Sequence, residues 1–380
     1  MEKLKQHRFA LSIYFFLSGL CFSTWASRIP TIKSYFDFDE AQLGNVLLAM
    51  PISSLIGLPI STWLVTKFHS RVPLLAAFVV FSISLVTIAF AETYVTLVAS
   101  ICLFAFCMRI LNISMNTQAL SLQKQFDRQI NGSFHGVWST GGIAGVGFST
   151  LMIANDIAMT THLIFVASFT FLSAVIAYHF VLKHDKSPLG NKLILGKPDP
   201  FIFYLGILIF FAAVCEGGMF DWSGIYFREV IHEELFTLGY LIFMIFMALS
   251  RFFSDRIIAH IGMEKTFLMS ASFISIGILT AIVFPFFWPA LIGFCLVGFG
   301  TAAVFPMTFS LAGTSTKYSP GMAISIIATY GTVGMFIGPP LIGYLAHAFS
   351  LKISFIIFIF CGLMFIPVSK LLFQNQKKAA

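Results

Sequence analysis

Charged and amide side chains are rare in the long apolar stretches of this sequence, and three of them share one helical face. Arg109, Asn112 and Asn116 are spaced by three and four residues in the stretch 94–122. This spacing places their side chains on the same side of a helix. An ionisable group within an apolar span is costly and usually faces a cavity or a partner. A guanidinium group beside two amides favours an anionic or hydroxyl-rich ligand.

A second polar group occurs in the stretch 200–228, where Glu216 and Asp221 lie on either side of two glycines. If the two stretches cross a membrane in opposite directions, Arg109 lies ~22 Å and Glu216 ~18 Å below the outer end of its own span. These two side chains are then at similar depths, near the midplane, and can meet. The same arithmetic places Arg28 and Asp221 each ~7–10 Å from the outer surface.

Two interpretations of Arg109 and Glu216 remain open. In the first, Arg109 and the two asparagines form the polar floor of a substrate cavity. Glu216 is then the counter-charge of Arg109, the proton-coupling carboxylate, or both. In the second, Arg109 and Glu216 form a structural ion pair that joins two halves of the protein and does not touch a substrate. The cost of burying charge in a membrane favours the first interpretation.

Other polar and aromatic residues receive more limited assignments. Arg28 and Asp221 are interpreted as a gating or structural pair, and Asp221 is a second candidate for proton coupling. Trp25 is a candidate for stacking on a sugar ring, with a membrane-interface belt residue as the alternative. Tyr330 is assigned to the same substrate-binding set as Trp25.

The composition identifies the solvent that surrounds these residues. The chain of 380 residues is 58% hydrophobic and only 10% charged, and it contains 46 phenylalanines. Its mean hydropathy is +0.91. A soluble domain carries roughly a quarter charged residues. So few charges cannot cover a water-facing surface, and most of the chain is therefore expected to lie in a bilayer.

The apolar stretches have the length of membrane-spanning helices, which need about 20 residues each. We expect an all-α membrane protein whose twelve transmembrane helices form two six-helix halves. The twelve stretches are 9–32, 41–66, 72–91, 94–122, 132–155, 159–182, 200–228, 235–258, 265–284, 288–314, 321–347 and 351–372.

A polar stretch at mid-chain divides the sequence. Residues 183–199 contain several glycines and prolines, which interrupt helices. This predicts an N-terminal six-helix bundle over 1–182, a cytoplasmic linker over 183–199 and a C-terminal bundle over 200–380.

Lysine and arginine in the short loops predict the orientation. With the N-terminus inside, 17 of these residues lie on the inner side and 4 on the outer side. We therefore expect both termini to be cytoplasmic in a bacterial inner membrane, with the first apolar stretch retained as a span. The net charge of +7 reflects this bias, so it gives no reason to expect a nucleic-acid partner.

A repeated glycine pair supports two related halves. Gly141 and Gly145 are separated by four residues, as are Gly334 and Gly338, and the two pairs are offset by 193 residues. Small residues at this spacing allow helix backbones to approach closely in lipid. The matched offset predicts equivalent helix contacts in both halves.

Enzymatic chemistry is not expected from this sequence. The six cysteines lie in apolar runs without metal-ligand spacing, and they are interpreted as small core residues. The sequence shows no metal-binding set, nucleophile elbow or phosphate loop. We therefore predict no catalytic residues, no metal and no cofactor.

Two basic loops resemble the inter-helix motif Gly-x-x-x-Asp-Arg-x-Gly-x-Arg of the major facilitator superfamily. In the first loop, Thr66 and His69 replace the usual aspartate and glycine, whereas the second loop retains Asp255 and Arg256, followed by Gly262. In that family the motif latches the cytoplasmic helix ends. The resemblance thus implies a gating role for Asp255 and Arg256, and Thr66 removes the charge from the first latch.

Five further strings are similar to the fucose-permease-related branch of that superfamily, including the YbjJ-type inner-membrane proteins. They are TWASRIP (24–30), MNTQA (115–119), SFHGVWS (133–139), EGGMFDWS (216–223) and GPPLIG (338–343). Relatives often carry aspartate where this chain has Asn112. The resemblance therefore shifts any proton coupling to Glu216 or Asp221.

The expected function is secondary active transport of a small polar solute, such as a sugar, a sugar acid or a related metabolite. It would proceed by alternating access, with protons as the coupling ion and a monomer as the working form. The alternative is proton-driven efflux of drugs or metabolites, which the absence of the Gly-Pro string typical of antiporters in the fifth stretch disfavours. A membrane-embedded enzyme or a sensor is the remaining alternative.

Overall fold

All secondary structure in the described part of the chain is helical. The computed structural model describes residues 2–126, 130–183, 199–318 and 320–379, and no strand occurs within these ranges. Among the described residues, eleven helical segments are long and apolar enough to cross a membrane. In the helix that corresponds to the predicted stretch 235–258, the side chains are described without a gap only over Thr237–Arg251.

The helices form two compact units. Unit 1 comprises Met1–Ile32 and Ala49–Ile194, and unit 2 comprises Lys33–Leu48 and Leu195–Ala380. The segment 33–48, which the sequence analysis assigned to the N-terminal bundle, thus groups with unit 2. Most of the predicted linker 183–199 lies outside the described residues.

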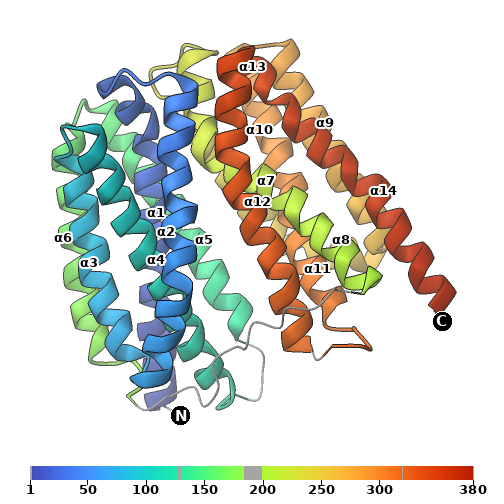
Figure 1. Ribbon diagram of the computed structural model, residues 1–380, viewed down its shortest axis with the longest axis horizontal. Coiled ribbons are helices and arrows are strands. Elements are labelled where there is room, and N and C mark those ends of the chain that lie inside the picture. Colours follow the sequence, from blue (N-terminus) through green and yellow to red (C-terminus); the bar gives the residue numbers. More distant parts are fainter. Residues whose placement is uncertain (1, 127–129, 184–198, 319, 380) are drawn as a thin grey trace. The chain divides into compact units, whose positions relative to one another are not determined.

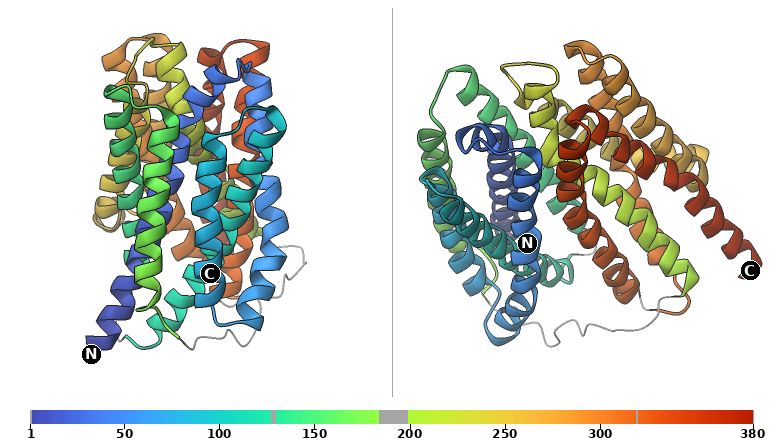
Figure 2. Two further views of the ribbon diagram at one scale, coloured as in Figure 1. Left: turned by 90° about the vertical axis from the view of Figure 1, so that its left-hand side faces the viewer. Right: turned by 45° about the horizontal axis from the view of Figure 1, so that its top comes forward.

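Unit 1 is built around an aromatic core. The ring of Phe104 stacks on Phe81, with ring centroids 4.4 Å apart, and Phe81 contacts Phe78 edge-on. The hydroxyl of Tyr14 donates to the carbonyl oxygen of Ala174 at 2.8 Å, which ties the first helix to the sixth. The helices run alongside one another (Figures 1 and 2). They are α1 (Glu2–Tyr35), α2 (Glu40–Lys67), α3 (Arg71–Ala89), α4 (Tyr94–Gln123), α5 (Asn131–Ala154) and α6 (Met159–Tyr178), with the ends of α1 and α2 in segment 33–48.

Unit 2 is organised around α7 (Pro200–Glu229), most of whose residues from Ile202 onward are buried. The helix begins where the side chain of Asp199 accepts a hydrogen bond from the backbone of Ile202 and proline occupies the first helical position. Its neighbours include α12 and α14. The other helices of this unit are α8 (Thr237–Ile261), α9 (Met263–Val283), α10 (Phe287–Ala302), α11 (Val304–Ala312), α12 (Pro320–Ala348), α13 (Leu351–Ser354) and α14 (Ile356–Ala379).

The repeated glycine pairs bring backbones together as predicted. A Cβ atom on Gly141 would collide with the carbonyl oxygen of Phe16, and one on Gly145 would lie 2.5 Å from that of Leu20. These contacts join α5 to α1. In unit 2 the pair on α12 meets α7 in the same way, with Gly334 against Phe210 and Gly338 against Val214. The partner residues are offset by 194 positions, within one residue of the 193-residue offset of the glycines.

Three predicted stretches differ from the observed helices by an early end or a break. The stretch 351–372 is broken at Phe355, between α13 and α14. The stretch 159–182 ends as a helix at Tyr178. Beyond that end, the side chain of Gln118 accepts from the backbone N–H of Leu182 and donates to its carbonyl oxygen, at 3.1 Å in each case. The stretch 288–314 is interrupted at Ala303. Pro306 has no backbone N–H, and its ring clashes with the carbonyl four residues earlier, at the end of α10.

Candidate functional site

The polar stripe on α4 is the best-exposed candidate for solute binding within unit 1. The Nε of Arg109 donates to the hydroxyl of Ser54 on α2 at 2.8 Å. The same side chain lies close to Gly57, where a Cβ would be 3.3 Å from the Cβ of Arg109. Ser54 and Gly57 are three residues apart, so one face of α2 supports the arginine.

The amides of the stripe extend this surface along α4. The Nδ2 of Asn116 donates to the backbone oxygen of Asn112 at 2.8 Å and to its side-chain oxygen at 3.3 Å. Asn112 is exposed and Asn116 is half-buried. The side-chain nitrogen of Asn112 therefore remains available to a ligand.

Arg109 retains most of its hydrogen-bonding capacity. A guanidinium carries five N–H donors, and Ser54 is the hydrogen-bond partner that the described residues provide. No carboxylate among them forms an ion pair with Arg109. The free edge of the guanidinium can therefore take a carboxylate or a pair of hydroxyls in two parallel hydrogen bonds.

Glu216 has its counter-charge within unit 2. Its carboxylate lies 3.2 Å from the Nη2 of Arg251 on α8, and its side chain is buried. The sequence analysis assigned that role to Arg109. Because Arg109 and Glu216 belong to different units, a direct contact between them stays a prediction. What the structure adds is a second cation that already neutralises Glu216.

Arg251 could have been found from the helix ends. Glu216 lies 13 residues before the end of α7, and Arg251 lies 14 residues after the start of α8. Since consecutive helices run in opposite directions and each residue rises about 1.5 Å, the two side chains reach the same depth. Arg251 was therefore a candidate partner of Glu216 that the sequence alone could have indicated.

Asp221 is a half-buried carboxylate on α7. In the described part of the chain it has no hydrogen-bond or ion-pair partner. Nearby residues hold α7 in place. The indole of Trp222 donates to the carbonyl oxygen of Pro339 at 3.0 Å, and the hydroxyl of Tyr226 donates to that of Ala281 at 2.8 Å. Asp221 is therefore a carboxylate held at a fixed position and free to take a proton or a cation.

Arg28 is held by neutral groups within unit 1. Its Nε donates to the Nδ1 of His162 at 3.0 Å, and its Nη2 donates to the carbonyl oxygen of Ile157 at 3.0 Å. Arg28 and Asp221 lie in different units, so the predicted pair between them stays a prediction. The sequence analysis did not consider His162, which is fully buried on α6.

The two aromatic candidates occupy packed positions. Trp25 is 1% exposed, and its ring centroid lies 6.2 Å from that of Phe104 in the core of unit 1. A solute cannot stack on it in this conformation. Tyr330 packs over Gly206 and makes an edge contact with Phe203 on α7. Gly206 is ten residues from Glu216, or ~15 Å along the helix, so Tyr330 is remote from the buried carboxylate.

The predicted latch residues are described in part. The side chain of Asp255 lies outside the described residues, and Arg256 is exposed on α8. The cysteines, interpreted from the sequence as core residues, are buried at four of the six positions and half-buried at the other two, and all are free thiols. Groups of three or more His, Cys, Asp or Glu suited to a metal ion are absent from the described residues.

An ion-pair cluster that the sequence analysis did not predict forms around Lys33 in unit 2. Its Nζ lies 2.6 Å from Glu229, at the end of α7, and 3.3 Å from Glu40, at the start of α2. Asp39 and Gln42 cap α2 beside it by exchanging two backbone-to-side-chain hydrogen bonds. We call Lys33, Glu40 and Glu229 the Lys33 cluster.

Replacement of Lys33 by Gln is expected to lower the free energy of unfolding by about 2 kcal/mol, the range for a charged hydrogen bond. The substitution leaves two carboxylates near each other without their cation. Denaturant unfolding of the purified protein measures the loss. Lys265→Gln, which removes an exposed lysine on α9, is the matched control. Equal losses in both variants would show that the Lys33 cluster does not stabilise unit 2.

Comparison with known proteins places the chain in a family. The sequence profile of the Major Facilitator Superfamily matches residues 11–319. This chain belongs to the major facilitator superfamily. As a member, it is a multi-pass membrane protein that transports a solute.

Individual similarities agree with membership of the superfamily. An uncharacterised major facilitator transporter of Yersinia pestis is 30% identical over 343 residues, covering 90% of this chain and 89% of its own length. The crystal structure of a bacterial homologue of the human lysosomal transporter Spinster covers 98% of both chains, with a TM-score of 0.75 and 12% identity. That of the nucleoside transporter NupG covers 96% of this chain and 98% of its own, with a TM-score of 0.71 and 14% identity. These structures show a shared fold, and the narrower resemblance to the fucose-permease-related branch stays a prediction.

Proposed function

We propose that the protein takes up a small polar solute, such as a sugar or a sugar acid, by alternating access and in symport with protons. The observation that carries this proposal is the guanidinium of Arg109, which is positioned by Ser54 and has no other hydrogen-bond or ion-pair partner among the described residues. A charged side chain within a membrane helix is costly, and such a residue is therefore usually one that binds a ligand or a partner. The exposed amide of Asn112 adds donors and acceptors for the hydroxyls of the same solute.

Glu216 is the proposed coupling group. Its buried carboxylate is stable as an anion while it is paired with Arg251. Protonation of Glu216 removes its negative charge and with it the attraction to Arg251. A proton and the Arg251 guanidinium therefore compete for the same carboxylate. Asp221 is the second candidate, because it has no competing cation among the described residues.

The remaining parts of the proposal concern the setting. The protein works as a monomer in the bacterial inner membrane with both termini in the cytoplasm. The support for this orientation is the excess of lysine and arginine on one side, 17 against 4. A latch function at Asp255 and Arg256 is proposed on the family motif alone.

A two-step measurement tests the proposal. A thermal-shift screen of sugars, sugar acids and nucleosides on the purified protein first identifies a ligand. Uptake of that ligand into liposomes is then expected to exceed equilibrium when the outside is more acidic, and to stop at equilibrium when the gradient is collapsed. Accumulation driven in the opposite direction would indicate efflux, and equilibration without accumulation would exclude proton coupling.

A further inference from the structure

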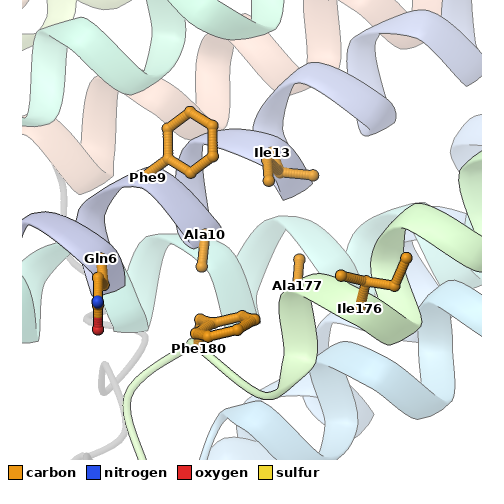
Figure 3. A pocket seen from close by; sticks show the side chains of 7 residues that line it. All are labelled: Gln6, Phe9, Ala10, Ile13, Ile176, Ala177 and Phe180. Carbon is orange, nitrogen blue, oxygen red and sulfur yellow. The ribbon is translucent and has the colours of Figure 1, made fainter. Parts of the chain in front are cut away.

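Unit 1 carries an apolar groove that the transport proposal does not use. Two adjoining cavities, of about 270 and 600 Å³, share Phe9 and Ile13 of α1 and Ile176 of α6. Figure 3 shows the smaller cavity, whose labelled side chains come from α1 and α6 and from Phe180 just after α6. Val137 of α5 contributes to the larger one. We call the two together the α1–α6 groove.

The groove is open and almost entirely apolar. Phe9 is 70% exposed and Ile176 is 64% exposed. The polar lining residues are Gln6, at the N-terminal end, and two serines. A hydrocarbon chain suits this lining, whereas a polar solute would find few partners.

The length of the groove matches one leaflet of a bilayer. Its lining extends from Gln6 to Leu17 on α1 and from Phe169 to Phe180 along α6. Each range covers eleven residue steps, or ~16 Å of helix. Half the thickness of a hydrocarbon core is ~15 Å. Both walls of the groove therefore extend from the membrane surface to about the midplane.

The surface end of the groove is basic. Lys3 and Lys5 are exposed one to two turns before Phe9, and Lys183 is exposed where α6 has ended. His7 contacts the carbonyl oxygen of Phe180 at 2.7 Å, which brings these two ends together. Within the described residues 2–8 and 179–183, Glu2 is the only acidic residue. Such a basic end attracts anionic headgroups.

We propose that the α1–α6 groove binds one anionic glycerophospholipid selectively, with an acyl chain in the groove and the headgroup phosphate against Lys3 and Lys5. Apolar length and charge complementarity each support this occupant. The lipid lies in the leaflet on the side of the membrane where the N-terminus is. The site is separate from the Arg109 stripe, so it stands whether or not the transport proposal does.

Native mass spectrometry of the purified protein tests the headgroup contact. The probe is an equimolar mixture of phosphatidylglycerol and phosphatidylcholine with identical acyl chains. The wild type is expected to retain phosphatidylglycerol preferentially, by about tenfold or more, since each lysine near an anionic headgroup contributes a factor of about five. The double variant Lys3→Gln/Lys5→Gln is expected to bring the ratio close to one. Lys265→Gln/Lys370→Gln removes two exposed lysines of unit 2 and is expected to leave it unchanged.

A groove-filling variant tests the acyl-chain contact. Ile176→Trp is expected to reduce the bound phosphatidylglycerol at least fivefold. Ile164→Trp makes the same change at an exposed position of α6 that does not line the groove, and it is expected to have no effect. Thermal melting of each variant shows that it is folded. The proposal is overturned if the wild type shows no preference, if both lysine doubles behave alike, or if Ile176→Trp binds as the wild type does.

Discussion

Replacing Arg109 with Gln is expected to reduce solute counterflow in liposomes by about 30-fold or more, because removing one partner of a charged contact that is buried in the complex costs about 2–5 kcal/mol. Glutamine preserves polarity but loses the positive charge and the forked donor geometry. Counterflow needs no proton gradient, so it reports solute binding and exchange alone. The ligand identified by thermal shift is the solute to measure.

Two further variants test whether the effect is specific to the guanidinium of Arg109. Arg109→Lys retains the charge without the fork and is expected to be impaired by roughly tenfold, since lysine cannot form two parallel hydrogen bonds. Arg228→Gln removes a half-buried arginine at the end of α7, outside the stripe, and is expected to leave counterflow nearly unchanged. Wild-type counterflow in Arg109→Gln would exclude Arg109 from the solute site.

Replacing Glu216 with Gln is expected to abolish gradient-driven accumulation of the solute while counterflow continues. Glutamine cannot exchange a proton, but it has nearly the same shape as a protonated glutamate. A carrier with this substitution can still exchange solute and no longer uses a pH gradient. Parallel measurements of accumulation and counterflow on the same liposomes separate the two effects. If accumulation persisted, Glu216 would lose the coupling role and Asp221→Asn would be the variant to measure next.

The stability of Arg251 variants checks the ion pair independently of transport. Arg251→Gln leaves the buried carboxylate of Glu216 without its cation, and such a loss typically costs 3–5 kcal/mol. In the double variant Glu216→Gln/Arg251→Gln both charges are absent, and most of the lost stability is expected to return. If the double variant were as unstable as Arg251→Gln, the pair would not account for the effect.

Hydropathy predicted the helices well because a bilayer imposes a simple rule on every span. Nearly all backbone groups must be satisfied within a helix of about 20 apolar residues. The predicted stretches 41–66 and 94–122 therefore differ from α2 and α4 by only one residue at an end. One difference arises where a single residue overrides the rule, as Pro306 does between α10 and α11.

The candidate site was predictable only in part. The spacing of Arg109, Asn112 and Asn116 identified a common face, because periodicity within one helix is visible in the sequence. Partners on other helices were not visible in the same way. Ser54, which positions Arg109, is one of many serines in the sequence. Lys33 lies between the predicted stretches 9–32 and 41–66, and its burial between two carboxylates depends on how the segment 33–48 packs within unit 2.

The paired glycines were predicted correctly because close approach in lipid requires a missing side chain, and that absence can be read directly. Their partners on the facing helices could not be read, since a backbone carbonyl has no sequence signature. Phe16, Leu20, Phe210 and Val214 became recognisable only in the structure. Their common offset of 194 positions supports an internal repeat of the two units more strongly than the glycines alone do.

The same glycine contacts determine where each unit can deform. Where Gly141 and Gly145 of α5 meet α1, and where Gly334 and Gly338 of α12 meet α7, the nearest atoms on the facing helix are backbone atoms, so at these points little side chain lies between the helices to absorb a displacement. The α1–α5 pair and the α7–α12 pair are therefore each expected to move as one rigid body. Bending must occur elsewhere in the unit, where long side chains separate the helices or where the helix is already interrupted, as at Ala303. A single methyl group added at Gly141, Gly145 or Gly334 would therefore push the two helices of its pair apart.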